Sequence, residues 1–207
     1  MKYKIDHIPK SKKRSGLPMT PKYLTIHSTA NLKSTARNER DWLTNPDNKG
    51  TASWHIVVDE KEAIEAVPLN EVAWHAGDGG QGPGNRYSIG IEICESGDRH
   101  KTLENAADLV AKMLKERGWG VDKLRRHYDW SGKICPRIFA DGYWAGWGSF
   151  KSEVAKRLDD KNKPSAWAKE SWEWAKGEGL MDGTRPKDNI TREEVAIILK
   201  RIMGRLK

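Results

Sequence analysis

The segment Ser88–Cys94, with the sequence SIGIEIC, alternates apolar with polar or small residues without a break. Because successive side chains of a β-strand point to opposite faces, its three isoleucines share one face and Glu92 and Cys94 share the other. Apolar residues then recur at helical spacing from Leu103 to Leu114, and Gly118 closes that pattern. These two segments predict a strand followed by a helix.

Further strands and helices are expected on both sides of this pair. The predicted strands are Tyr23–Ser28, Ser53–Asp59, Ala63–Val67 and a short one near Lys123–Arg126, and a short helix is predicted over Ala36–Leu43. A tight turn joins the second and third of these strands. Strands separated by helices favour an α/β sheet for residues 20–160.

The two ends of the chain differ from this pattern. Residues 1–22 are basic and interrupted by proline and glycine, which predicts an extended basic arm. A charged linker, residues 159–164, precedes two predicted helices, Ala166–Gly177 and Thr191–Arg205, the second opened by a capping box. We therefore expect two domains, 1–160 and 161–207. The second is a small α-helical domain that is too short for a robust core and docks on the first or pairs with another copy.

Composition excludes several classes of protein. No apolar run approaches the roughly 18–20 residues of a membrane-spanning helix, and no secretory signal peptide is visible. Two cysteines cannot form a disulfide framework. The net charge of +8 and the 10 Trp, against 5 Tyr and 2 Phe, indicate anionic partners and exposed grooves for flat or sugar-like surfaces. A nucleic-acid-binding protein is disfavoured because the charge is diffuse and matches no binding motif.

His27, His127 and Cys135 are candidate zinc ligands. A catalytic zinc takes three protein ligands of the His, Cys or carboxylate type and keeps one position open for water. His27 ends a predicted strand, and the other two flank a short loop. The spacing alone is weak, and it leaves open that the histidines are ordinary polar residues and Cys135 a small buried one.

Five ordered motifs carry a resemblance to a known family. They are IHSTA at residues 26–30, SWHIVVD at 53–59, AWHAG at 73–77, SIGIEIC at 88–94 and HYDWSGKICP at 127–136. In this order they resemble the type 2 N-acetylmuramoyl-L-alanine amidases of phage lysis and bacterial wall turnover, relatives of the peptidoglycan recognition proteins. The resemblance covers about residues 20–158. It implies a central mixed β-sheet flanked by helices, and a Zn²⁺ ion held by His27, His127 and Cys135.

The resemblance also implies an activity: hydrolysis of the amide between N-acetylmuramic acid and L-alanine in bacterial peptidoglycan. Glu92 matches the catalytic glutamate, which acts as general base, and Lys133 matches a lysine that stabilises the oxyanion. Some relatives carry an assisting tyrosine where this chain has Trp54. Indole does not exchange a proton near neutral pH, so a tyrosine-dependent mechanism is not expected.

The sequence also offers candidates for the walls of a substrate groove. Trp54, Trp74 and His75 are candidate substrate-binding residues. His55 and His75 could instead support the site from behind or be ordinary structural histidines. The absence of a visible signal peptide fits a phage or prophage endolysin that waits in the host cytoplasm and reaches the wall through a holin pore.

The C-terminal segment resembles, more loosely, a single S-layer-homology repeat. The matching stretches are residues 167–175, 179–183 and 190–195. Such repeats anchor proteins to anionic wall polymers, so this resemblance implies wall attachment, weak binding or an oligomer built through the repeat. Alternatively Trp167, Trp172 and Trp174 form its small core. A non-catalytic peptidoglycan-binding module is the main rival to the enzyme, and Cys135 argues against it, because binding-only relatives lack this ligand.

Overall fold

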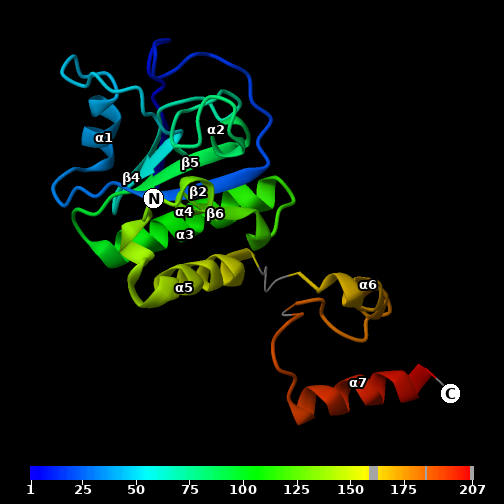
Figure 1. Cartoon of the computed structure of the whole chain (residues 1–207). Coiled ribbons are helices and arrows are strands. Elements are labelled where there is room, and N and C mark those ends of the chain that lie inside the picture. The colour runs from blue at the N-terminus through cyan, green and yellow to red at the C-terminus, as the bar shows by residue number, and fades with distance from the viewer. Residues whose placement is uncertain (159–162, 185, 206–207) are drawn as a thin grey trace. The chain divides into compact units, whose positions relative to one another are not determined.

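The computed structural model describes residues 1–158, 163–184 and 186–205, and the chain divides into two compact units, Met1–Leu158 and Asp159–Lys207. The first unit is built around a six-stranded sheet with the strand order β1-β4-β3-β5-β2-β6 (Figure 1). Its strands are β1 (Lys2–Ile5), β2 (Tyr23–Ser28), β3 (Ile56–Val58), β4 (Glu62–Glu65), β5 (Ser88–Ile93) and β6 (Leu124–Arg126). The hairpin β3–β4 is antiparallel and the other pairs are parallel, which confirms the predicted mixed sheet.

The alternation in β5 sorts the two faces of the sheet as expected. Its isoleucines belong to the main apolar cluster, which also contains Val110 and Leu114 of α3 (Arg99–Glu116) and Phe150 of α5 (Asp141–Leu158). Both helices cover this face, below the sheet in Figure 1. Burying each such aliphatic side chain contributes about 1.5–3 kcal/mol. This layer fixes the register of β5 and therefore the side on which Glu92 emerges.

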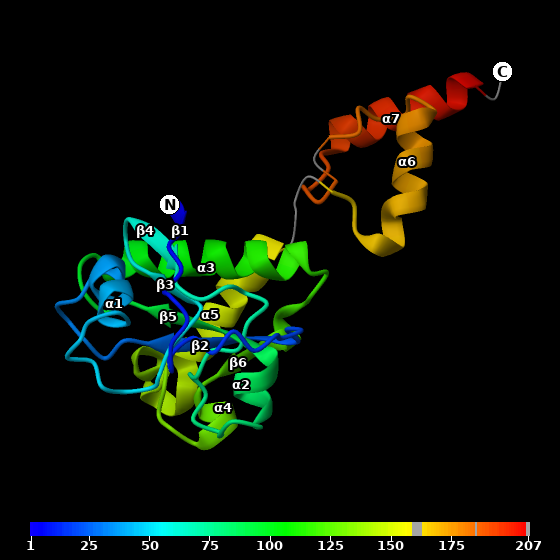
Figure 2. The same ribbon diagram turned by 90° about the horizontal axis from the view of Figure 1, so that it is seen from above.

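The opposite face carries shorter helices and loops. These are α1 (Ala36–Trp42), α2 (Pro83–Tyr87) and α4 (Tyr128–Ser131), whereas the 3-10 turns η1 (Val121–Lys123) and η2 (Arg137–Phe139) contact α5. In Figure 2, α2 and α4 lie together beside β6 and β2, while α1 lies near β3 and β4. Helices on both faces confirm the predicted α/β class. The thinner cover on this face leaves room for a cleft.

The basic arm at the N-terminus is partly a strand. Lys2–Ile5 forms β1 at the edge of the sheet, parallel to β4. Lys4 pairs with Glu62, and Arg14 Nη2 lies 2.8 Å from Glu71 Oε1. Sequence inspection missed β1 because its residues are mostly exposed and its pairing partner is far along the chain. Part of the positive charge of the arm is therefore neutralised by the protein's own carboxylates.

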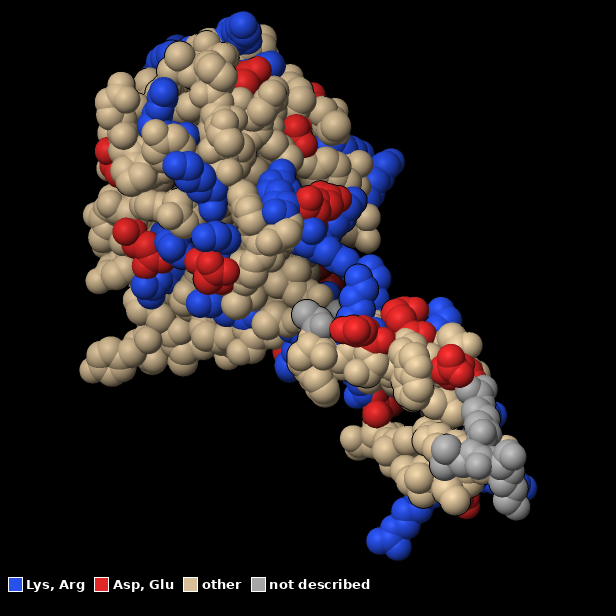
Figure 3. Space-filling model, turned by 90° about the vertical axis from the view of Figure 1, so that its right-hand side faces the viewer, with Lys and Arg blue, Asp and Glu red and all other residues tan. Residues whose placement is uncertain are grey.

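Other elements differ from the predictions in extent. The strand expected over Ser53–Asp59 is regular only at Ile56–Val58. Helices α2, α4 and α5 were not predicted. In α5 the buried Trp147, Phe150 and Val154 do recur at helical spacing, but interspersed glycines obscure the pattern. The face seen in Figure 3 mixes acidic and basic side chains rather than gathering one sign, in keeping with a diffuse charge.

The second unit contains η3 (Ala166–Ala168), α6 (Lys169–Gly177) and α7 (Arg192–Arg205). The predicted capping box is present, because Glu194 N–H donates to Thr191 Oγ1 (3.1 Å) and Thr191 N–H donates to Glu194 Oε2 (2.8 Å). Trp167 is 89% exposed and Trp174 is 61% exposed, so the three tryptophans do not together form a core. The first four residues of the predicted linker, 159–162, lie outside the described residues. Among those described, no helix is long and apolar enough to cross a membrane.

Candidate metal centre and active-site cleft

A cavity of about 460 Å³ lies in the first unit near the carboxyl ends of β2 and β5. Ligands commonly bind beyond the carboxyl ends of parallel strands, because the loops that follow these strands converge there. His27, near the end of β2, is paired in register with Glu92 of β5, and both line the cavity. His127 follows β6 directly, and Cys135 lies in the loop after α4. The sheet therefore brings together residues about 100 positions apart.

The three predicted zinc ligands form one buried cluster. Their ligand atoms all lie within 4.8 Å of one another. His27 Nδ1 is 3.0 Å from His127 Nδ1 and 3.7 Å from Cys135 Sγ. Among the described residues this is the one group of three or more His, Cys, Asp or Glu side chains that could hold a metal ion.

The chemistry of this donor set fits a cation. His27 Nε2 is 3.0 Å from His75 Nδ1, and the His127 ring is hydrogen-bonded to the carbonyl of Ala76. Once the other ring nitrogen carries the proton, Nδ1 of each histidine presents a lone pair. Two lone pairs 3.0 Å apart repel one another unless a proton or metal ion lies between them. Burial lowers the pKa of His127 to about 4, and the pKa of His27 lies well below its ordinary value for the same reason. Both rings are therefore neutral, as metal ligands must be.

Cys135 supports the same conclusion. Burial, reinforced by the charge of Glu92, raises the pKa of its thiol to about 12. A thiol in this environment becomes a thiolate only when a cation lies beside it. The residues present thus fit a borderline-soft divalent ion with nitrogen and sulfur ligands.

Glu92 is the cleft's unpaired acid. Its Oε2 is buried and has no hydrogen-bond partner among the described residues. Burial, with a smaller contribution from the charge of Glu39, raises its pKa to about 8, although Lys133 opposes the shift. A carboxyl group whose pKa lies near neutrality can both accept and return a proton. Such a group beside a metal site is typical of a general base.

Two cations line the same cavity as this acid. Lys133 lines the cavity, and its charge lowers the pKa of His27 and His127. Arg137, which sequence inspection missed, also lines the cavity. Its Nη2 donates to Glu95 Oε2 (2.7 Å), and its backbone N–H donates to Ser28 Oγ (3.1 Å). The pairing with buried Glu95 is a contact between side chains 42 positions apart, which no local pattern reveals.

The predicted groove residues Trp54, Trp74 and His75 all line the cavity. Trp54 and Trp74 both line it and are half-buried. Trp54 also packs against two small apolar clusters, so it is part core and part wall. Thr29 is a further lining residue that was not predicted, and its buried Oγ1 has no partner among the described residues. The cavity therefore extends from the donor cluster to a surface that a substrate can occupy.

The other two histidines lie behind the cluster. His75 contributes to the cavity wall, but both of its ring nitrogens are within hydrogen-bond distance of protein atoms, His27 Nε2 and the Ser88 carbonyl. His55 accepts from Gly90 N–H and donates to the Glu71 carbonyl. Among the described residues, His55 therefore makes no hydrogen bond to His27, His127 or Cys135, and it has a structural role in the sheet.

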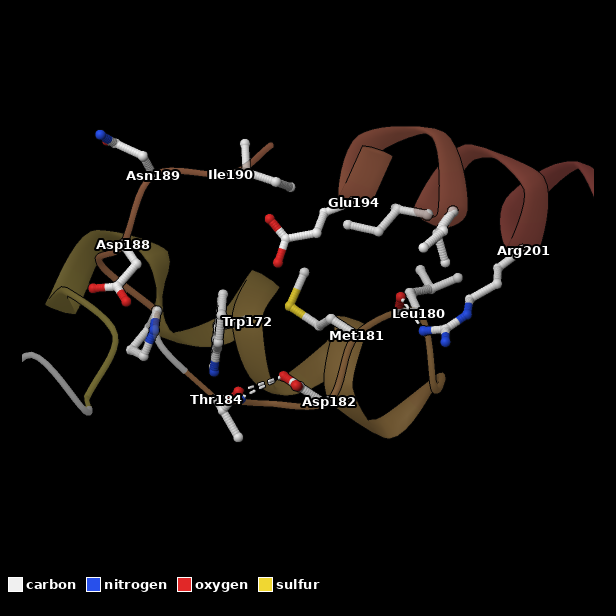
Figure 4. A pocket seen from close by; sticks show the side chains of 13 residues that line it. Trp172, Leu180, Met181, Asp182, Thr184, Asp188, Asn189, Ile190, Glu194 and Arg201 are labelled. Atoms are coloured by element: carbon white, nitrogen blue, oxygen red, sulfur yellow. Dashed lines mark hydrogen bonds between the residues drawn. The ribbon is translucent and has the colours of Figure 1, made fainter. Parts of the chain in front are cut away.

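The second unit has a cavity of its own, of about 430 Å³, between α6 and α7 (Figure 4). Trp172 and Met181 form its apolar wall, and Glu194 of α7 also faces it. Arg201 Nη1 donates to the Leu180 carbonyl (2.8 Å), and Thr184 bonds to Asp182, as the dashed lines in Figure 4 show. The carboxylates of Asp182 and Glu194 at this cavity are engaged by Thr184 and Thr191.

Two imidazoles, a thiol and an unpaired carboxylate gathered in one cleft form a candidate site for metal-dependent hydrolysis. Residues 17–138 match the family model described as N-acetylmuramoyl-L-alanine amidase, and the chain belongs to this family.

Individual relatives agree with the family model. The chain is 46% identical over 164 residues to N-acetylmuramoyl-L-alanine amidase CwlA of Bacillus subtilis strain 168, an alignment that covers 75% of this chain and 59% of that protein. The solved catalytic domain of XlyA matches with a TM-score of 0.68 and 43% identity, covering 74% of this chain and 99% of that one. A mutant endolysin from Bacillus subtilis matches with a TM-score of 0.67 and 43% identity, covering 73% and 97%. The chain thus spans little more than half the length of the curated relative.

Proposed function

We propose that this protein is a zinc-dependent hydrolase that cuts the amide between N-acetylmuramic acid and L-alanine in bacterial peptidoglycan. The observation that carries the proposal is the convergence of His27 Nδ1, His127 Nδ1 and Cys135 Sγ beside the unpaired carboxylate of Glu92. Membership of the amidase family supports the choice of bond.

Zinc is the proposed ion because the donor set is two imidazoles and a thiolate. When bound, zinc supplies Lewis acidity at the scissile carbonyl and lowers the pKa of the attacking water. The chain's own contribution is to hold both histidines neutral and to supply the thiolate. Burial keeps both histidine rings in this neutral state.

Glu92 is the proposed general base. It takes the proton of the attacking water and returns it to the leaving nitrogen, which departs as the free amino group of L-alanine. Its raised pKa, near 8, suits this shuttle, because the carboxyl group can be reprotonated within each cycle. Trp54 has no exchangeable proton that could replace it.

Lys133 is the proposed stabiliser of the oxyanion. Its charge acts on the groups in the cleft, and a fixed cation beside the developing negative charge lowers the barrier. Trp54 and Trp74 are the proposed walls for the glycan and the stem peptide, since broad aromatic rings suit sugar faces.

For the unit 159–207 we propose attachment to anionic wall polymers, as its resemblance to an S-layer-homology repeat implies. The cavity beside Trp172, together with the exposed Trp167 and Trp174, supports a binding role. Its two helices leave several apolar side chains of α7 exposed, among them Leu199 and Met203, which supports pairing with another copy.

We also propose that the protein is a phage or prophage endolysin, present in the host cytoplasm until a holin pore admits it to the wall. Its likeness to a solved endolysin supports this assignment. The competing function is a peptidoglycan-binding module without catalysis. The presence of Cys135 in the donor cluster favours the enzyme.

Purified cell walls test the proposal. Incubation with the zinc-loaded protein should release amino groups from N-terminal alanine, and a chelator should abolish the release. Release of reducing sugars would identify a glycosidase, and binding without release would identify the non-catalytic module. Cys135→Ser should bind walls but release nothing.

A further inference from the structure

His75 is held in a fixed position next to the donor cluster. Its backbone N–H donates to Asn85 Oδ1 (2.8 Å), and its ring lies against the middle of β5. A Cβ added at Gly90 would come within 2.6 Å of the His75 ring. The glycine in the middle of a buried strand is therefore required by the close approach of this imidazole.

The hydrogen bonds of His75 determine which of its nitrogens carries the proton. Nε2 lies 3.1 Å from the Ser88 carbonyl oxygen, which can only accept, so Nε2 must donate. The ring is buried and meets the imidazoles of His27 and His55 edge to face, and such surroundings favour an uncharged ring. A neutral ring that donates from Nε2 is an acceptor at Nδ1.

This assignment passes to His27. His75 Nδ1 lies 3.0 Å from His27 Nε2 and accepts, so His27 Nε2 must donate. The lone pair of His27 is then on Nδ1, the atom that faces His127 Nδ1 and Cys135 Sγ. A carbonyl on β5 thereby sets the tautomer of a metal ligand on β2 through one intervening imidazole.

We propose that His75 is a positioning residue that fixes the tautomer and ring orientation of His27, so that His27 Nδ1 is presented to the metal ion. This inference rests on the part of the proposed function that assigns a metal ion to the donor cluster. Protein atoms engage both ring nitrogens of His75, so neither nitrogen can form a polar contact with the substrate. His75 therefore supports the site and does not bind substrate through its ring nitrogens. Partners of this kind commonly change metal affinity by about 10–100-fold.

Heteronuclear NMR of the metal-free protein tests the tautomer directly. Long-range nitrogen–proton correlations should show His75 and His27 both protonated at Nε2 and bare at Nδ1. A His75 ring protonated at Nδ1, or a charged ring at neutral pH, would overturn the assignment. This measurement needs no variant and no metal.

Zinc affinity, measured by competition with a chromophoric chelator, tests the consequence. His75→Leu removes the acceptor and should weaken zinc binding by about 10–100-fold, whereas His75→Asn, whose amide oxygen can accept from His27 Nε2, should recover most of the affinity. His55→Leu is the matched control, since His55 is also a buried neighbour but, among the described residues, makes no hydrogen bond to the three donors. It should bind zinc as the unmodified protein does.

Circular dichroism first establishes that each variant is folded, and the cobalt-substituted proteins give a second readout. The ligand-field spectrum should change in His75→Leu and return in His75→Asn. Unchanged affinity in His75→Leu, or equal losses in His75→Leu and folded His75→Asn, would refute the role. If His75→Leu does not fold, the NMR tautomers and His75→Asn decide. An unmodified protein that binds no zinc would instead refute the proposed function.

Discussion

His27 and Glu92 are direct partners across two parallel strands, β2 and β5. The register therefore sets a candidate metal ligand and a candidate general base side by side, on the face of the sheet opposite the isoleucine core. A shift of one residue in either strand would turn one of the two into the apolar layer. The same packing that stabilises the sheet thus aligns the chemistry.

Glu92→Gln should lower turnover strongly and raise stability at neutral pH. Loss of the general base is expected to lower kcat by about 10²–10⁴-fold while zinc stays bound. The pKa of Glu92 is raised to about 8 in the folded protein. The carboxyl group therefore lowers the free energy of unfolding at every pH at which it is ionised in the unfolded chain but protonated in the folded one. This cost begins above the ordinary value of 4.5 and grows until about pH 8. Urea unfolding of the metal-free proteins at pH 4 and pH 7.5 measures it.

Glu95→Gln is the control with the opposite sign. Burial alone would raise the pKa of Glu95, but its hydrogen bonds to Arg137, Ser28 and Ala30 lower it overall. Its charge stabilises the fold above the ordinary pKa, so the variant should be less stable at pH 7.5. If Glu92→Gln is no more stable than the unmodified protein at pH 7.5, then the buried carboxyl of Glu92 is ionised in the folded protein without loss of stability.

Cys135→Ser should lose the metal and keep the fold. A hydroxyl is a poor substitute for the thiolate, so zinc affinity should fall by more than the ~10–100-fold typical of a lost supporting partner. Far-ultraviolet circular dichroism checks the fold and chelator competition checks the affinity. Cys94→Ser is a useful comparison, because Cys94 is also buried but lies outside the cluster. Equal zinc affinity in the unmodified protein and Cys135→Ser would remove Cys135 from the ligand set.

Lys133→Met should lower kcat by about 10²–10³-fold with little change in zinc affinity, because the substitution removes a charge near the developing oxyanion. Lys133→Arg, which keeps the charge in a different shape, should recover part of the rate. Steady-state assays on a soluble muramoyl-peptide separate kcat from KM. A full rate in Lys133→Met would leave oxyanion stabilisation to the metal ion alone.

The metal-free protein should lose stability on mild acidification. Burial lowers the pKa of His55 from 6.5 to about 4, so below pH 6.5 the unfolded chain takes up a proton that the folded chain refuses. The free energy of unfolding should therefore fall by about 1.4 kcal/mol per pH unit for each such histidine across this window, and level off below it. Unfolding curves at several pH values measure the slope. His55→Gln should make the slope shallower, and an unchanged slope would exclude His55 as a contributor.

Deleting residues 159–207 should weaken adsorption to intact cells more than it slows the cutting of soluble muramoyl-peptides. Pelleting assays with whole cells measure the first effect and amine release measures the second. Trp172→Ala in the full chain is the companion variant, since it alters the wall of the cavity in this unit. Equal adsorption of the full chain, the variant and the truncated chain would refute wall attachment by this unit.

Sequence patterns were sufficient where structure is local. The alternation of Ser88–Ile93, the β3–β4 hairpin and the Thr191 capping box all depend on neighbours in the chain. Strand β1 depends on pairing with a strand some 60 residues later, and its own residues are mostly exposed.

The site divides in the same way. The types of the three donor residues and their motifs were visible in the sequence, whereas the pairing of Arg137 with Glu95 and the contact of His75 with His27 were not. Both arise when separate segments are folded together. A backbone carbonyl determines which imidazole nitrogen faces the cluster. Because every residue type has a backbone carbonyl, the sequence does not reveal this contact.

The donor cluster joins a residue near the start of the sheet to two residues about 100 positions later. An ion held there ties the first long strand to the last one, in the manner of a removable crosslink. Loading at about 1,000 times the dissociation constant would add about 4 kcal/mol to the free energy of unfolding. Thermal resistance and metal supply are therefore coupled, and the protein's lifetime in a medium that strips metals is shortened together with its activity.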